Sequence, residues 1–278
     1  MKLKTGSKVN IGLRVHSQRA DGYHLISTVF QELDFGDSIE IIKIKSGCMF
    51  SSNVDWLENN NSNLCVSAWE KMKEYFSNIK GVKITLKKQI PSGSGLGGGS
   101  SNAAGIINGL DKLYNLKLNI KERESIAGQL GADIPFFING GTQIGTDIGN
   151  KLTVLSESIG GVYLLIIPKI KINTSWAYGQ IKKKLDFVQE PPNFASFLKE
   201  KYFPDEIFNN DFEKVIFPTY PEIGQIKTSL LELGARFASL SGSGSTVFGI
   251  FNNESAAKSA ESFFKSSHHT VITNPKKR

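Results

Sequence analysis

Three observations predict an α+β fold made of two domains. Strand-like and helix-like patterns alternate from residue 8 to about residue 150, and a new series begins with the apolar segment Val162–Ile167. The length of 278 residues suffices for one large domain or two modest ones. We therefore expect an N-terminal domain at residues 1–155 and a C-terminal domain at residues 156–278.

Alternating apolar and polar residues predict the strands of the first domain. In Val82–Ile90 the apolar residues alternate with lysine and threonine. This pattern predicts a strand with one buried face and one solvent-exposed face. Similar patterns predict strands at Lys8–His16 and Asp37–Lys45. The Asp-Gly pair within Arg19–His24 predicts a turn.

Apolar residues three and four positions apart predict the helices of the first domain. We expect helices at Asn63–Phe76, Asn102–Leu116 and Lys121–Gly131. Asn119 is the expected N-cap of the third helix, and Gly131 is the expected end of that helix.

The rest of the chain follows the same logic. Residues 132–150 are rich in turn formers and predict a hairpin, and helices with loops are expected through the proline-rich 190s. The predicted elements of the second domain are a strand at Val162–Ile167, a helix at Ile223–Leu233, a glycine-serine loop at Ser241–Ser245, a strand at Thr246–Phe251 and a helix at Glu254–Phe264.

Composition argues against several classes of function. No apolar stretch is long enough to span a bilayer, and the N-terminus lacks the apolar part of a secretory signal. Cys48 and Cys65 have no metal-ligand spacing, so we expect no cysteine metal site and, by default, a cytoplasmic protein. The net charge of +7 leaves nucleic-acid binding open, but no zinc-finger or aromatic-basic pattern supports it. We expect a small-molecule substrate and no nucleic acid, membrane or obligate protein partner.

The stretch PSGSGLGGGSS (91–101) is the strongest functional signal. A linker would join independent units, whereas this stretch joins a half-buried strand directly to an amphipathic helix. A helix N-terminus has unsatisfied N–H groups and a partial positive charge, and glycines let the backbone approach a ligand closely. The stretch therefore predicts a phosphate site, and a tight structural turn is the alternative.

Two common phosphate motifs do not fit this stretch. A P-loop ends in Gly-Lys-Ser/Thr, whereas this stretch ends in GGSS (98–101) without a lysine. The letters GSGLGG (93–98) match a dinucleotide fingerprint, but the preceding strand alternates with lysines. In addition, no acidic residue ends a second strand about 20 residues further on.

The stretch PSGSGLGGGSSNAA (91–104) resembles the ATP-phosphate motif of the galactokinase, homoserine kinase, mevalonate kinase and phosphomevalonate kinase (GHMP) superfamily. SKVNIGL (7–13) and SLSGSGSTVFGIF (239–251) resemble the first and third motifs of that superfamily, in the same order. The resemblance implies a kinase with an N-terminal ATP-binding domain, a C-terminal ferredoxin-like α/β sandwich domain, and ATP and Mg²⁺ as cofactors. The implied ATP-binding residues are Asn63, Lys88, Pro91, Ser92, Gly93, Ser94, Gly95, Leu96, Gly97, Gly98, Gly99, Ser100 and Ser101.

Two further segments narrow the resemblance to one branch of the superfamily. QRADGYHLISTVFQELDFGDSIEI (18–41) and LGADIPFFINGG (130–141) are similar to kinases that phosphorylate the 2-hydroxyl of 4-diphosphocytidyl-2-C-methyl-D-erythritol in the non-mevalonate isoprenoid pathway. The sequence departs from the branch at a few positions. Ser7 replaces the usual alanine, Thr246 replaces a common cysteine, and Ser92 and Ser94 replace small or apolar residues.

The resemblance implies Asp133 and Lys8 as the catalytic residues. Asp133 is the candidate base for the substrate hydroxyl, and the alternative is that it caps a short helix beginning at Ile134. Lys8 is its implied partner, and the alternative is a surface lysine at a strand start. No pattern in the sequence identifies the protein ligands of magnesium.

The implied substrate contacts are Asn10, Tyr23, His24 and Thr174. A tyrosine can stack on a cytosine ring, and a histidine can stack or bond its edge. The alternative for Tyr23 and His24 is an ordinary turn flank. Three other functions stay open: a kinase for homoserine, mevalonate or a sugar; a nucleotide-binding protein without catalysis; and a basic nucleic-acid module.

Overall fold

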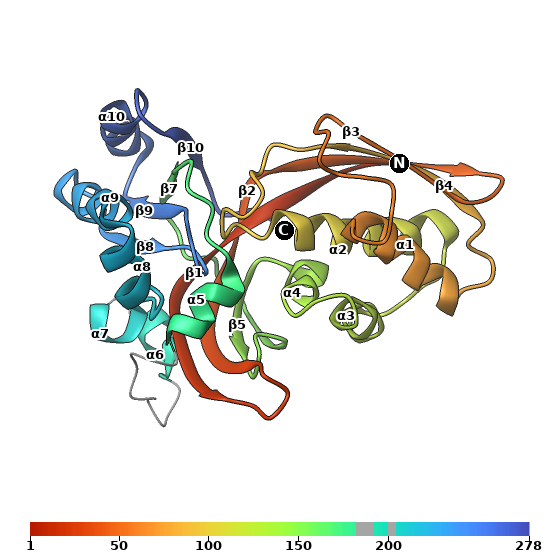
Figure 1. The fold of residues 1–278 in the computed structure, drawn as a ribbon, viewed down its shortest axis with the longest axis horizontal. Coiled ribbons are helices and arrows are strands. Elements are labelled where there is room, and N and C mark those ends of the chain that lie inside the picture. Colours follow the sequence, from red (N-terminus) through yellow and green to blue (C-terminus); the bar gives the residue numbers. More distant parts are fainter. Residues whose placement is uncertain (182–191, 200–203, 278) are drawn as a thin grey trace. The chain divides into compact units, whose positions relative to one another are not determined.

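The computed structural model describes residues 1–181, 192–199 and 204–277 (Figure 1). The contacts divide the chain into two compact units. Unit 1 comprises Met1–Ser7, Gly36–Ser92 and Gly97–Gly140; unit 2 comprises Lys8–Phe35, Gly93–Leu96 and Gly141–Arg278. Two long strands, β1 (Lys2–Gln18) and β2 (His24–Ile44), run from one unit into the other. The predicted domains 1–155 and 156–278 stay a prediction, because these units group residues by contact.

Unit 1 is a sheet with helices on one face. The end of β2 pairs antiparallel with β4 (Gly81–Lys87), and β3 (Cys48–Ser52) lies parallel to β4. Helices α1 (Leu64–Tyr75) and α2 (Gly98–Tyr114) lie along one face of these strands (Figure 1). Every second residue of β4 is buried, as the alternation predicted. The remaining helices are α3 (Ile120–Gly128) and α4 (Ile134–Asn139).

Unit 2 contains a hairpin and a four-stranded antiparallel sheet. The hairpin consists of β5 (Thr142–Thr146) and β6 (Lys151–Leu155). The sheet has the order β10 (His269–Thr273), β7 (Val162–Ile167), β9 (Val247–Phe251) and β8 (Phe237–Leu240). Its helices are α5 (Thr174–Ile181), α6 (Phe194–Lys199), α7 (Asp205–Phe208), α8 (Glu213–Thr219), α9 (Pro221–Glu232) and α10 (Glu254–Phe264).

The core of unit 2 lies between this sheet and its helices. Leu164, Val247 and Leu230 are fully buried members of one apolar cluster that joins β7, β9 and α9. The α+β class predicted from the sequence is therefore confirmed. Among the residues that the structure describes, no helix has the length and apolar character that a bilayer crossing requires.

Several predicted boundaries were wrong. The strands predicted at Lys8–His16 and Asp37–Lys45 correspond to parts of the longer strands β1 and β2. Helix α2 begins at Gly98 rather than Asn102, inside the glycine stretch. Helix α3 ends at Gly128 with Gln129 as its C-cap, so Gly131 does not end it. Residues 132–150 are only partly a hairpin, because α4 precedes β5: its apolar residues are buried together, and a proline is well tolerated in a first helical turn. The proline-rich 190s lie partly outside the described residues.

Candidate active site

The glycine stretch has the backbone of a ligand-binding loop. Gly93, Gly95 and Gly97 have φ values of +69°, +79° and +71°, in the left-handed region that costs other residues energy. Gly97 is the N-cap of α2, and it has no side chain to accept from the first N–H groups of that helix. These N–H groups and the positive end of the helix dipole fit an anion such as phosphate.

The residues of the stretch divide into a buried set and an exposed set. Ser94, Leu96 and Ser101 are buried, Ser100 is half-buried, and Pro91, Ser92, Gly93 and Gly99 are exposed. The exposed positions leave part of the backbone open to a ligand.

In unit 2, a second glycine-serine loop packs directly on the first. Ser241 Oγ donates to Gly95 O at 3.0 Å, and the Thr246 N–H donates to Ser94 O at 3.2 Å. A Cβ atom on Gly95 would lie 2.1 Å from Ser241 O, so only glycine fits there. The two loops that resemble the second and third superfamily motifs are therefore in contact.

Lys8 and Asn10 lie beside these loops with their side chains buried. The Lys8 ammonium donates to Asn10 Oδ1 at 2.6 Å, and the Asn10 amide donates to Thr28 Oγ1 at 2.9 Å. The Lys8 N–H donates to Leu96 O at 2.9 Å, which ties strand β1 to the glycine stretch. Lys8 is only 4% exposed, so the alternative of a surface lysine is wrong. A buried ammonium needs polar partners, and Asn10 is one of them.

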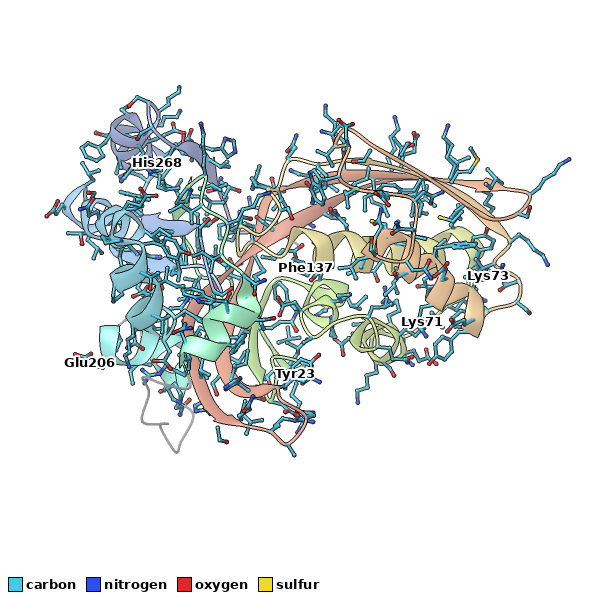
Figure 2. All side chains as sticks on the ribbon, viewed as in Figure 1. Tyr23, Lys71, Lys73, Phe137, Glu206 and His268 are labelled. Carbon is cyan, nitrogen blue, oxygen red and sulfur yellow. The ribbon has the colours of Figure 1, made fainter. Side chains whose placement is uncertain are left out.

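The predicted turn between β1 and β2 is confirmed. The Arg19 N–H donates to Tyr23 O at 2.7 Å. The Arg19 guanidinium binds Asp147 at 2.8 Å and Asp21 at 2.9 Å, and these hydrogen bonds raise the pKa of Arg19 above its ordinary value. Tyr23 is 58% exposed. Its side chain is labelled in Figure 2. The turn therefore leaves the Tyr23 ring accessible to a ligand.

His24 and Thr174 contact residues that sequence reasoning did not select. The His24 ring stacks on Tyr178, with ring centroids 5.1 Å apart and an interplanar angle of 20°. Thr174 begins α5, and its hydroxyl lies 3.0 Å from Ser243 Oγ in the second loop. Tyr178 follows Thr174 by one helical turn, so both side chains lie on one side of α5. That spacing was the only signal that could have selected Tyr178.

Asp133, in unit 1, stands at the N-cap position of α4. Its side chain makes no capping hydrogen bond, although Pro135 occupies the first turn as expected. The interpretation of Asp133 as a helix cap therefore lacks the hydrogen bond that defines a cap. The side chain is half-buried.

Lys88 and Asn63 have defined partners within unit 1. Lys88 Nζ lies 2.5 Å from Asp37 Oδ2, in a buried ion pair, and 3.0 Å from where a Gly98 Cβ would stand. Lys88 therefore lies beside the first residue of α2. Asn63 is the N-cap of α1, and its side chain accepts from the Cys65 N–H at 3.0 Å. This hydrogen bond stabilises the start of the helix. Sequence reasoning missed Asp37.

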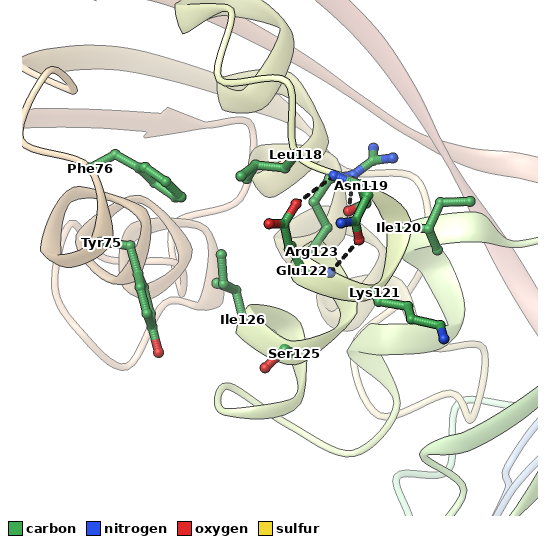
Figure 3. A pocket seen from close by; sticks show the side chains of 10 residues that line it. All are labelled: Tyr75, Phe76, Leu118, Asn119, Ile120, Lys121, Glu122, Arg123, Ser125 and Ile126. Carbon is green, nitrogen blue, oxygen red and sulfur yellow. Dashed lines mark hydrogen bonds between the residues drawn. The ribbon is translucent and has the colours of Figure 1, made fainter.

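A surface pocket of about 940 Å³ lies elsewhere in unit 1, between the end of α1 and the start of α3 (Figure 3). Tyr75, Phe76 and Ile126 contribute its apolar lining, and Asn119 and Glu122 form a capping box at one side. None of its lining residues is a predicted site residue. The loop geometry, and not this cavity, therefore identifies the candidate site. Within the described ranges, no group of three or more His, Cys, Asp or Glu residues could hold a metal ion.

Comparisons with known proteins identify the superfamily. The family model for the GHMP kinases N terminal domain matches residues 63–141, and the model for the GHMP kinases C terminal matches residues 194–269. The fold and the paired glycine loops thus define a GHMP kinase.

The similarity extends over nearly the whole chain. A 4-diphosphocytidyl-2-C-methyl-D-erythritol kinase from Pelodictyon phaeoclathratiforme is 34% identical, covering 98% of this chain and 96% of its own. The same kinase from Chlorobium phaeobacteroides is 36% identical, covering 99% and 97%. A crystal structure of 4-(cytidine 5'-diphospho)-2C-methyl-D-erythritol kinase is 29% identical, covers 100% of both chains and has a TM-score of 0.86. The chain belongs to the 4-diphosphocytidyl-2-C-methyl-D-erythritol kinase family.

Proposed function

We propose that this protein transfers the γ-phosphoryl group of ATP to the 2-hydroxyl group of 4-diphosphocytidyl-2-C-methyl-D-erythritol. The observation that carries the proposal is the contact between the two glycine loops beside the buried Lys8 and Asn10. Membership of the family supports the choice of substrate. The substrate, the magnesium ion and the cytoplasmic location predicted from the sequence belong to this proposal.

The glycine stretch and the first turn of α2 would hold the ATP phosphates, because their backbone N–H groups and left-handed glycines fit an anion. Magnesium, when bound, supplies positive charge to the phosphate oxygens. No carboxylate cluster among the described residues defines its site, so water and phosphate would supply most of its ligands. Lys88, beside Gly98, would add a contact to the nucleotide.

Four side chains would hold the acceptor substrate. Tyr23 would stack on the cytosine ring, and His24, backed by Tyr178, would bond or stack at its edge. Asn10 and Thr174 would contact the polar groups near the hydroxyl. A tertiary alcohol is crowded, so correct placement should supply much of the rate.

Asp133 would accept the proton of the 2-hydroxyl group while Lys8 orients that group. The side chain of Asp133 is not used as a helix cap, and the ammonium of Lys8 is buried and held by Asn10. The pairing of the two residues stays a prediction.

Mass spectrometry of the substrate after incubation with Mg-ATP tests the proposal. The wild-type protein should add one phosphoryl group, and Asp133→Asn should reduce the rate by about 100-fold or more. Asp111→Asn is the matched control, because Asp111 accepts from the Leu118 N–H at the far end of α2 and takes no proposed part in catalysis. Phosphorylation of homoserine in place of the cytidyl substrate would contradict the proposed substrate. ATP binding without any turnover would contradict catalysis.

A further inference from the structure

We propose that Asn210 is a positioning residue that holds the loop Ser241–Ser245 against Lys8 and Asn10. The inference concerns unit 2 alone, and its link to the reaction rests on the proposed function. Neither the loop motifs nor the predicted contacts include Asn210. It precedes α8 in the chain and is 1% exposed.

The side-chain amide of Asn210 donates two hydrogen bonds to the loop and accepts one from the start of the next segment. Its Nδ2 group donates to Leu240 O and to Gly242 O, each at 2.8 Å. Its Oδ1 atom accepts from the Phe212 N–H at 3.0 Å. The two donated bonds end on the carbonyl groups on either side of Ser241, so this one side chain fixes the start of the loop.

The start of the loop touches the residues proposed for catalysis. A Cβ on Gly242 would lie 3.3 Å from Lys8 Nζ and 3.6 Å from Asn10 Oδ1, so the Gly242 backbone lies directly against both side chains. Ser241 also donates to Gly95 O of the glycine stretch at 3.0 Å. A shift of the loop start would therefore displace both Lys8 and the glycine stretch.

The residues that follow Asn210 give it a rigid base. Asp211 Oδ2 accepts from the Val15 N–H of β1 at 2.8 Å, and β1 is the strand that carries Lys8 and Asn10. Glu213 Oε1 accepts from the Leu240 N–H at 2.9 Å, at the end of β8. The two acidic residues bind the strands, and Asn210 binds the loop. The segment thus sets the spacing between the strand of Lys8 and the loop that contacts it.

The variant Asn210→Asp separates the two uses of this side chain. Aspartate has the same size and keeps the acceptor for the Phe212 N–H, but it loses both donors and sets a carboxylate oxygen against two carbonyl oxygens. If Asn210 only holds the start of α8, Asn210→Asp should behave as the wild type. If it positions the loop, kcat should fall by about 100-fold, the effect of misplacing reacting groups by about 1 Å. The kcat of Asn210→Ala, a variant that introduces no charge, should fall by a similar factor.

Gln31→Glu is the matched control for loss of a buried amide. Gln31 is 0% exposed and lies in the same unit. Its Oε1 atom accepts from Thr142 Oγ1 at 2.8 Å and from the Ile159 N–H at 2.9 Å, and its Nε2 group donates to Glu32 O at 2.8 Å. None of these partners belongs to either glycine loop. This variant should keep its kcat within a factor of about two, whatever its loss of stability.

Hydrogen exchange of residues 240–246 gives a second readout that needs no substrate. The Gly244 N–H donates to Ser241 O at 3.0 Å and the Thr246 N–H donates to Ser94 O at 3.2 Å, so both should be protected in the wild type. Exchange of this segment should accelerate in Asn210→Asp and Asn210→Ala, and should not change in Gln31→Glu.

The outcomes separate the two proposals. A wild-type protein that does not phosphorylate the cytidyl substrate would refute the proposed function, while hydrogen exchange still tests the anchoring of the loop. An active wild type with an equally active or equally protected Asn210→Asp would overturn the role of Asn210. Slow turnover with accelerated loop exchange, both confined to the Asn210 variants, would support it.

Discussion

At the scale of single residues, Lys8 and Lys88 each bring a lysine side chain away from water, and the groups they bind differ in charge. Lys8 binds the neutral amide of Asn10, and Lys88 binds the carboxylate of Asp37. Burial of an ammonium group is costly unless it is paired, and breaking a buried pair leaves the remaining charge without its partner. The Asp37–Lys88 pair should therefore matter more for stability than any exposed pair.

Asp37→Asn tests this pair, because asparagine can still accept from the Gln89 and Ile90 N–H groups, which lie 2.6 and 2.9 Å from Asp37 Oδ1. We expect Asp37→Asn to lower the free energy of unfolding by about 3 kcal/mol. The double variant Asp37→Asn/Lys88→Met should lose less, because no buried charge then remains. Urea unfolding measures both values.

The exposed pair Glu254–Lys258 is the control for this measurement. Both side chains are more than half exposed, at 64% and 65%, so water screens their attraction and breaking this pair should cost much less than breaking Asp37–Lys88. Equal losses of unfolding free energy in Asp37→Asn and in the double variant would show that leaving the Lys88 charge without its partner costs nothing extra.

The sequence pointed to some residues of the candidate site and missed others for a physical reason. Lys8 and Asn10 share one strand, so their common orientation follows from the period of a strand. Asp37 and Lys88 are 51 positions apart, and Asn210 and Gly242 are 32 apart. Contacts at such separations depend on tertiary packing and leave no local pattern. Asp37 and Asn210 were therefore not predictable from periodicity, whereas Tyr178 had the helical spacing from Thr174 as its one signal.

At the scale of elements, α2 shows how packing overrides helix propensity. Glycine costs about 1 kcal/mol relative to alanine within a helix, so propensity alone disfavours a helix start inside the glycine stretch. The helix begins at Gly98, where a Cβ would lie 2.9 Å from Ile90 Cγ2 and 3.0 Å from Lys88 Nζ. The chain therefore uses glycine in the first turn because neighbouring side chains leave no room.

The glycine stretch offers a matched pair of substitutions. Gly93 has φ +69° with nothing within 4 Å of its would-be Cβ, so Gly93→Ala should cost only the left-handed strain of about 1–2 kcal/mol. Gly95 has φ +79° and a would-be Cβ only 2.1 Å from the backbone oxygen of Ser241, so Gly95→Ala must also push the two loops apart. We expect at least twice the loss of stability in Gly95→Ala.

Urea unfolding of Gly93→Ala and Gly95→Ala measures the two losses of stability. Hydrogen exchange at the Thr246 N–H, which bonds Ser94 O, should accelerate in Gly95→Ala alone. Similar stability and similar exchange in both variants would mean that the packing of the two loops contributes little.

At the scale of the whole molecule, periodicity predicted the class of the fold and the bounds of its strongest elements. The predicted strand Val162–Ile167 and the predicted helix Glu254–Phe264 match β7 and α10 residue for residue, because each has a strong pattern and clear ends. The short strands β3, β8 and β10 were not assigned, since four or five residues carry little periodicity. The placement of Gly93–Leu96 with unit 2 depends on contacts with residues near 241, which no local pattern indicates.

The stability of the molecule should fall in alkaline solution because of its buried cysteine. Burial raises the pKa of the Cys65 thiol from 9.0 to about 12. The folded state therefore keeps this proton while the unfolded chain begins to lose it near pH 9. The stabilisation is fully present below that pH and is lost as pH rises toward the folded-state value, so raising the pH to about 10 should remove about 1.4 kcal/mol. Urea midpoints between about pH 8 and pH 10 should fall more steeply in the wild type than in Cys65→Ala, whose constant packing loss does not alter the slope. Identical slopes would mean that this thiol ionises equally readily in the folded and unfolded chains.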